Sequence, residues 1–147
     1  TGHEAERIRA ELEGTSAAFT HNPDYTEGLS TSLIKGLDAV PADADGAVVL
    51  LGDMPGVSAQ TIDRLIAAFS PDDGRGICVP TFNGRRGNPV LWSRRYFSEM
   101  KNLAGDIGAK ALIGLHGEDV AEVAVTTDDI LTDIDTPDAL EQERRKT

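Results

Sequence analysis

The feature that most constrains the fold is a continuous apolar run that leads directly into an acidic loop. Ala47-Val48-Val49-Leu50-Leu51 contains no polar side chain, and Gly52-Asp53-Met54-Pro55 follows it at once. An uninterrupted apolar run of this length is typical of a central strand that is buried on both faces of a parallel sheet. We therefore predict a central strand over residues 47–51, with the acidic loop at its carboxyl end.

Strand and helix patterns alternate along the rest of the chain. The predicted helices cover residues 3–12, 29–40, 58–69, 109–115 and 137–144. The further predicted strands cover residues 19–21, 77–81, 89–92 and 120–125, with a short extended stretch at 130–134. This alternation predicts an α/β fold with a mostly parallel sheet, in one domain spanning residues 1–147.

Net charge, hydropathy and cysteine content indicate which kinds of partner the protein binds and in which cellular compartment it works. The formal charge is −11, which disfavours nucleic acid because phosphate contacts need clusters of Lys and Arg. No apolar run approaches the roughly 18 residues of a membrane-spanning helix, so we expect no membrane partner. Cys78 is the single cysteine, which favours a cytoplasmic location over an oxidising one. Its apolar surroundings predict a buried core residue and not a nucleophile.

Asp53 is the first candidate for chemistry, because ligands bind at the carboxyl ends of strands in parallel sheets. Mg²⁺ prefers one or two carboxylates together with water and phosphate oxygens. The alternative is that Asp53 only caps the following helix, although Ser58 lies closer to that helix and is a good cap. We predict that Asp53, next to Gly52, holds a divalent cation.

A second acidic segment, Asp133-Ile134-Asp135-Thr136-Pro137, offers a partner for Asp53. In an extended segment Asp133 and Asp135 point to the same side. The simpler alternative is that Asp135 or Thr136 caps the last predicted helix. A cation held between Asp53 and Asp135 would bridge the phosphates of a nucleotide and neutralise their charge.

Basic and amide side chains follow the Asn83-Gly84 turn. Arg85 and Arg86 can clamp a phosphate, or they can form a solvated hairpin tip. Gly87 and Asn88 indicate a close backbone approach and an amide that is ready to bond a polar ligand.

Two predicted helix starts also carry glycine and free amides. Residues 28–32 and residues 105–110 can each receive an anion at the helix N-terminus. A plain helix entry explains each of them equally well.

Taken in order, these segments resemble a known family. The motifs are Asn22-Pro23-x-Tyr25-x-x-Gly28-Leu29-Ser30-x-Ser32-Leu33, Gly52-Asp53-Met54-Pro55, Arg86-Gly87-Asn88-Pro89-Val90, Gly105-Asp106-x-Gly108-Ala109 and Asp133-Ile134-Asp135-Thr136-Pro137. The chain is similar to the MobA-like nucleotidyltransferases, and most similar to the molybdenum cofactor cytidylyltransferase branch. Each motif is common alone, whereas five in the correct order over nearly the whole chain are specific.

The resemblance implies a Rossmann-like three-layer α/β/α fold and a cytoplasmic enzyme that depends on Mg²⁺. It implies that CMP is transferred from CTP to a phosphorylated acceptor, molybdopterin, with release of pyrophosphate. The implied metal ligands are Asp53 and Asp135. The implied nucleotide-binding residues are Gly28, Ser30, Ser32 and Gly52, and the implied acceptor-side residues are Gly87, Asn88, Pro89 and Asp106.

One departure from the family pattern leaves alternatives open. Family members begin with a strand and a glycine-rich Leu-Ala-Ala-Gly-x-Ser-x-Arg-type loop, whereas Thr1-Gly2-His3 resembles the middle of a member. We therefore expect an N-terminally truncated domain, whose exposed strand edges favour a homodimer or low stability. The alternatives are a non-catalytic cofactor-binding or chaperone module of molybdenum-enzyme maturation, and a guanylyltransferase or sugar-phosphate nucleotidyltransferase.

Overall fold

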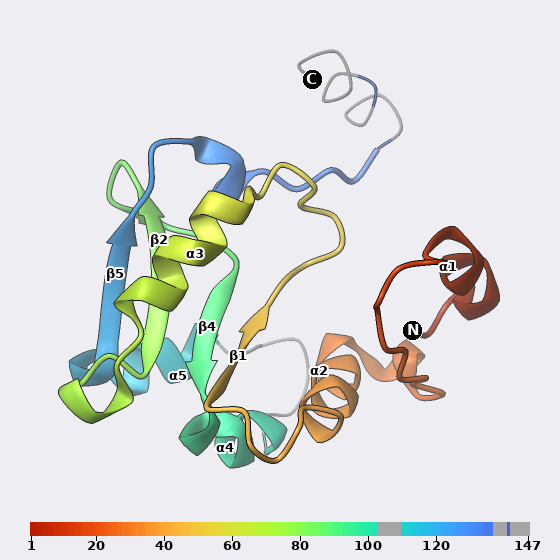
Figure 1. The fold of residues 1–147 in the computed structure, drawn as a ribbon, viewed down its shortest axis with the longest axis horizontal. Helices are drawn as coiled ribbons and strands as arrows, with labels where there is room; N and C mark the ends of the chain where they lie inside the picture. The colour runs from red at the N-terminus through yellow and green to blue at the C-terminus, as the bar shows by residue number, and fades with distance from the viewer. Residues whose placement is uncertain (103–109, 137–140, 142–147) are drawn as a thin grey trace. The chain divides into compact units, whose positions relative to one another are not determined.

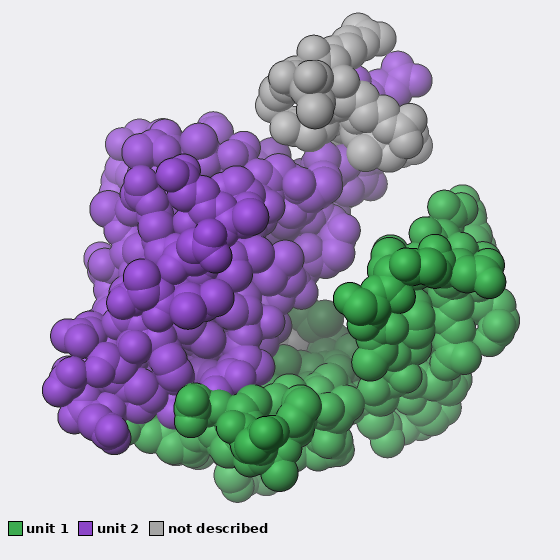
Figure 2. Space-filling model, in the orientation of Figure 1, with its two compact units in different colours: residues 1–45, 94–115 green, residues 46–93, 116–147 purple. Residues whose placement is uncertain are grey.

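The computed structural model describes residues 1–102, 110–136 and 141, and it divides the chain into two compact units (Figure 2). Unit 1 comprises residues 1–45 and 94–115, and unit 2 comprises residues 46–93 and 116–147. Each unit is therefore built from two segments that are separated in the sequence.

Unit 1 is helical. Its elements are α1 (Ala5–Glu11), η1 (Tyr25–Glu27), α2 (Leu29–Asp38), η3 (Arg94–Tyr96), α4 (Phe97–Lys101) and α5 (Lys110–Leu115), where η marks a 3-10 helix. Leu37 of α2 and Met100 of α4 are buried, and the Lys101 Nζ atom lies 2.5 Å from Asp38 Oδ1. The helices predicted near residues 3–12, 29–40 and 109–115 are confirmed.

The strand predicted over residues 19–21 does not form. The backbone hydrogen bonds described for this stretch go to Thr1: its terminal amine donates to the Thr20 carbonyl at 2.6 Å, and the Asn22 N–H donates to its carbonyl at 2.8 Å. A strand needs a ladder of backbone hydrogen bonds to a neighbouring strand, and the bonds to the single residue Thr1 do not form one. Residues 19–21 therefore do not form a strand.

Unit 2 contains the sheet (Figure 1). Its elements are β1 (Gly46–Val49), α3 (Ala59–Ala68), η2 (Pro71–Asp73), β2 (Ile77–Phe82), β3 (Arg85–Arg86), β4 (Val90–Ser93), η5 (Gly117–Asp119), β5 (Val120–Ala124) and η6 (Asp128–Leu131). The strands run in the order β1-β4-β2-β3, and β5 pairs with β2.

The pairing of these strands corrects one part of the prediction. β2 pairs in parallel with β5, whereas β1 with β4, β2 with β4 and β2 with β3 are antiparallel. β1, β2 and β5 consequently point in one direction. The α/β class is confirmed, but neighbouring strands of the described sheet are paired mainly antiparallel. The reason is that β4 runs back between β1 and β2, which an apolar pattern does not report.

β1 lies at the edge of the described sheet and not at its centre. All four of its residues are half-buried, and among the described strands β1 pairs with β4 alone. Leu50, immediately after the strand, is 48% exposed. The prediction of a strand buried on both faces is therefore wrong for this sheet, because an apolar run reports hydrophobicity and not the number of neighbouring strands.

The core of unit 2 forms where α3 covers one face of the sheet (Figure 1). Leu65 of α3 packs with Cys78 of β2 and Leu91 of β4, and these three side chains are at most 5% exposed. Ser58 caps the helix as predicted, since its Oγ accepts the Thr61 N–H at 3.2 Å. Burial of apolar side chains against the sheet is the dominant favourable contribution to such packing.

The turn predicted at Asn83-Gly84 is confirmed, whereas the extended stretch predicted at 130–134 is confirmed only in its second part. Asn83 and Gly84 both have positive φ, 50° and 75°, and they form the predicted turn between β2 and β3. Residues 128–131 form the 3-10 helix η6, so the extended stretch predicted at 130–134 begins only after it.

The last predicted helix and the membrane prediction concern the C-terminal segment and the helices as a group. The helix predicted over 137–144 falls largely outside the described residues. Within the described part of the chain, none of the helices has the length and apolar character needed to cross a bilayer.

Candidate functional site

The loop after β1 presents Asp53 to solvent while Met54 anchors it. The Met54 side chain is only 4% exposed, whereas the Asp53 side chain is exposed. The Met54 N–H donates to the Leu51 carbonyl at 3.4 Å, and the Val57 N–H donates to the Met54 carbonyl at 3.3 Å. A buried neighbour and two turn hydrogen bonds therefore hold the backbone that carries this carboxylate.

The second acidic segment lies against this loop. The Ile134 N–H donates to the Asp53 carbonyl oxygen at 2.8 Å, and Asp133 and Asp135 are the chain neighbours of Ile134. Asp53 and Asp135 are both exposed, so water or a ligand can reach both carboxylates. The structure thus brings together the two segments that the sequence marked as a pair, and their metal role stays a prediction.

The Gly87-Asn88-Pro89 segment joins the same group of loops in unit 2. The Asn88 N–H donates to the Ile130 carbonyl at 3.0 Å, only a few residues before the acidic segment. The peptide bond between Asn88 and Pro89 is cis. Asn88 is half-buried and Pro89 is buried. The predicted contact of these residues with an acceptor is not tested by these positions.

The carboxylates of Asp53 and Asp135 in unit 2 suit a divalent cation that keeps open coordination positions for water or phosphate. Within the described residues, no group of three or more His, Cys, Asp or Glu side chains is arranged to hold a metal ion. One or two carboxylates with open positions for water and phosphate oxygens is how proteins commonly bind Mg²⁺. Asp53 and Asp135 provide such a pair of carboxylates on adjoining segments, so the residues present are compatible with this ion.

The residues predicted to lie by a nucleotide belong to unit 1. Gly28 has φ 112°, a backbone conformation that favours glycine, and it precedes α2. The Asn22 side chain, 2% exposed, donates through Nδ2 to Thr31 Oγ1 and to Ser32 Oγ, both at 2.9 Å. The role of Asn22 in holding the start of α2 has no signal in the sequence and is visible only in the fold.

A cavity of about 420 Å³ lies in unit 1 beside this helix. The residues that line it include Ser32 and Lys35 from α2 and Thr20 and Asn22 from the preceding segment. Gly28 and Ser30 do not line it. Lys35, Ser32 and Thr20 are residue types that can donate hydrogen bonds to an anion. Asp106 lies outside the described residues.

The Arg85-Arg86 pair forms β3 and is exposed. Arg86 Nε donates to Glu122 Oε1 at 2.7 Å, and both side chains are about half exposed, at 47% and 50%. This ion pair joins β3 to Glu122 of β5 at the solvated surface, which favours the solvated-tip interpretation over a phosphate clamp for Arg86.

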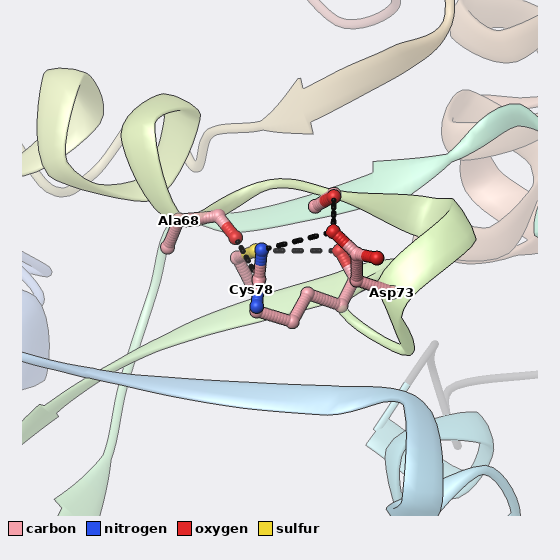
Figure 3. Close-up of polar contacts among 5 residues, drawn as sticks. Ala68, Asp73 and Cys78 are labelled. Carbon is pink, nitrogen blue, oxygen red and sulfur yellow. Dashed lines mark hydrogen bonds and ion pairs between the residues drawn. The ribbon is translucent and has the colours of Figure 1, made fainter.

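Cys78 is a structural residue, as the sequence indicates. It is fully buried, and its thiol donates to the Arg75 carbonyl with Sγ 3.9 Å from the oxygen (Figure 3). Burial raises the pKa of Cys78 from 9.0 to about 11, while Arg75 opposes the rise and Asp119 adds to it. Arg75 Nε also donates to the Ala68 carbonyl at 3.0 Å. A buried, protonated thiol is inert as a nucleophile.

Comparison with known protein families identifies the chain. Residues 1–122 match the MobA-like NTP transferase domain, which is most of the molecule. The chain belongs to the MobA-like NTP transferase family. The resemblance deduced from the ordered motifs is therefore confirmed.

Two curated relatives of this MobA-like chain come from bacteria. The purine catabolism protein PucB of Bacillus subtilis is 33% identical over 83% of this chain and 58% of that protein. The molybdenum cofactor cytidylyltransferase of Escherichia coli is 30% identical over 84% of this chain and 60% of that protein. The chain thus spans about three-fifths of the length of these relatives.

Solved structures agree with the fold of this MobA-like chain. Rv0371c from Mycobacterium tuberculosis H37Rv superposes with a TM-score of 0.77, at 30% identity over 99% of this chain and 74% of that one. A homologue from Mycobacterium sp. strain JC1 gives a TM-score of 0.76 at 31% identity, over 99% of this chain and 71% of that one. A third structure, Rv0371c in complex with manganese, gives 0.73 at 30% identity, over 96% of this chain and 73% of that one.

Proposed function

We propose that this chain is the body of a divalent-metal-dependent nucleotidyltransferase that transfers CMP from CTP to a phosphorylated acceptor of the molybdopterin type. The observation that carries the proposal is the hydrogen bond from the Ile134 N–H to the Asp53 carbonyl, which joins the two acidic segments. Membership of the MobA-like family supports the reaction class. The cytidylyltransferase relative supports the base and the acceptor, and the manganese complex of a solved relative supports a divalent cation. We propose Mg²⁺ as that cation.

The proposed reaction exchanges one phosphoanhydride bond for another. An oxygen of the acceptor phosphate attacks the α-phosphorus of CTP and forms a new P–O bond. The bond from that phosphorus to the bridging oxygen breaks, and pyrophosphate leaves with the electron pair. Asp53 and Asp135 would hold the cation, which when bound neutralises the phosphate charge. Because both carboxylates are exposed, phosphate oxygens and water can complete the coordination.

The other predicted residues keep the roles that the resemblance implies for them. Ser32 and Lys35 line the cavity of unit 1, which supports a nucleotide-binding role for Ser32. We keep the same proposed role for Gly28 and Ser30 because they stand at the start of the same helix, α2. On the acceptor side we keep Gly87, Asn88, Pro89 and Asp106. Gly52 leaves the backbone beside Asp53 open, since a Cβ there would meet no atom within 4 Å.

The decisive variant is Asp53→Asn, which removes the charge and keeps the shape. We expect CMP transfer, measured by pyrophosphate release in the longest natural protein that contains this chain, to fall by about a hundredfold or more. Calorimetry should show weaker binding of Mn²⁺ with CTP. Asp63→Asn is the matched control, because Asp63 is an exposed carboxylate on α3 of the same unit. Unchanged transfer in Asp53→Asn would rule out the metal assignment.

A panel of nucleotides and acceptors tests the finer part of the proposal. Preference for GTP, or for a sugar phosphate as acceptor, would replace the cytidylyl assignment with one of the two transferase alternatives. Acceptor binding without measurable NTP binding would favour a non-catalytic binding or chaperone module.

A further inference from the structure

Gly87 lies so close to Ile130 that no side chain fits between them. A Cβ added to Gly87 would overlap the Ile130 carbonyl oxygen and would lie 2.9 Å from both its carbonyl carbon and its Cδ1 atom. Gly87 is not among the glycines with positive φ. Glycine is therefore required here for space and not for backbone freedom, and part of the obstacle is backbone, which cannot rotate away.

Two backbone hydrogen bonds hold Gly87 and Asn88 in this position. The Gly87 N–H donates to the Pro80 carbonyl of β2 at 2.9 Å, and the Asn88 N–H donates to the Ile130 carbonyl at 3.0 Å. The first bond ties the loop to a strand whose residues are mostly buried. The second bond joins the same loop to Ile130, which is itself only 1% exposed.

The chain between Ile130 and the acidic segment is short and turned. Thr132 closes the end of η6, because its N–H donates to the Asp129 carbonyl at 3.4 Å and its hydroxyl donates to the Asp128 carbonyl at 3.2 Å. Two residues later the Ile134 N–H reaches the Asp53 carbonyl at 2.8 Å. The stretch 130–134 is therefore held at one end by the 87–88 loop and at the other by the Asp53 loop.

We propose that Gly87, besides its place on the acceptor side, is a positioning residue for the metal carboxylates that acts through Ile130. The absent side chain lets the Asn88 N–H reach the Ile130 carbonyl. We call this bond, together with the bond from the Ile134 N–H to the Asp53 carbonyl, the clasp, and it sets Asp135 against the Asp53 loop. The inference rests on the proposed function for the cation, whereas the clasp is defined by the hydrogen bonds alone. Bound ions and substrates tolerate misplacement of their ligands by only about 0.5 Å. A shift of Ile130, transmitted along residues 130–134, would therefore disturb the position of Asp135.

The test is Gly87→Ala, followed by amide hydrogen exchange and by titration with Mn²⁺ alone. We expect the Ile134 amide to lose protection at least about tenfold, and Mn²⁺ affinity to fall by about tenfold to a hundredfold, as for partners that orient metal ligands. The Val125 amide, which donates to the Thr81 carbonyl of β2 at 2.9 Å, should stay protected and show that unit 2 is folded. Gly117→Ala is the matched control, since a Cβ there meets nothing within 4 Å.

The outcomes separate this inference from the proposed function. If Gly87→Ala leaves both Ile134 protection and Mn²⁺ affinity at the level of the unmodified chain, the positioning role is overturned. If the unmodified chain binds no Mn²⁺ but the variant still deprotects Ile134, the clasp stands and the metal assignment fails.

A second measurement covers the case in which Gly87→Ala does not fold. In the unmodified chain, the Asn88 and Ile134 amides should exchange through one opening with a shared dependence on denaturant, because one clasp protects both. Independent opening of the two amides would overturn the inference without any substitution.

Discussion

At the scale of single residues, adjacent positions in one loop take opposite roles. Met54 is buried and fixes the loop, whereas Asp53 remains exposed and its backbone carbonyl receives the Ile134 N–H. A carboxylate that must stay accessible is thus placed by its neighbours and not by its own side chain. Sequence patterns identify the carboxylate, while the accepting carbonyl has no sequence signal.

Cys78 carries a pH-dependent prediction. Its folded pKa of about 11 lies above its ordinary value of 9.0, so the unfolded chain loses the thiol proton first as the pH rises. The stability due to this group is complete below pH 9.0 and is lost as the pH rises toward about 11. The slope is at most about 1.4 kcal/mol per pH unit.

The measurement is urea unfolding at neutral and alkaline pH in the unmodified chain and in Cys78→Ala. The unmodified chain should lose more stability between the two conditions, by about 1 kcal/mol, because other titrating groups are common to both proteins. Equal losses in the two proteins would contradict the raised pKa.

At the scale of elements, helix caps show how much a local signal can decide. Ser58 accepts the Thr61 N–H at the start of α3, and Leu65, from the same helix, lies in the core of unit 2. The cap therefore stabilises the helix that covers the sheet. Thr127 precedes η6 at the equivalent position but makes no side-chain cap hydrogen bond.

Ser58→Ala should lower the free energy of unfolding by about 1 kcal/mol, because an N-terminal amide of α3 loses its partner. Thr127→Ala should change it by less than about 0.5 kcal/mol. Chemical denaturation followed by circular dichroism compares the two, and equal effects would show that the cap hydrogen bond is not the cause.

At the scale of the whole molecule, the edge strand β1 carries the main liability. Its residues are apolar and half-buried, it has no charged residue or proline, and it pairs with β4 alone among the described strands. Native edge strands are usually protected by charge, proline or a covering element. We therefore expect concentration-dependent self-association of the chain.

Leu50→Lys should weaken that association by placing a charge directly after β1, where Leu50 is 48% exposed. Sedimentation velocity over a range of concentrations measures the effect. Leu115→Lys is the control, because it removes an exposed leucine, 72% exposed, at the end of α5 in unit 1. A chain that stays monomeric at all concentrations, or equal effects of both variants, would contradict a role for the β1 edge.

Features with local causes can be predicted from the amino-acid sequence. The helix periodicity of α2 and α3, the Ser58 cap, the Asn83-Gly84 turn and the apolar surroundings of Cys78 each depend on neighbouring residues, and the ordered motifs revealed the family. The sequence also named Asp53 and Asp135 as a pair, from their types and their flanking segments.

Which distant segments meet is visible only in the folded chain. The antiparallel β4 between β1 and β2, the edge position of β1, the Ile134 to Asp53 hydrogen bond and the contact of Gly87 with Ile130 join residues far apart in the chain. Their energies come from packing and backbone pairing between segments, and a pattern of apolar and polar residues along one segment does not encode its partner.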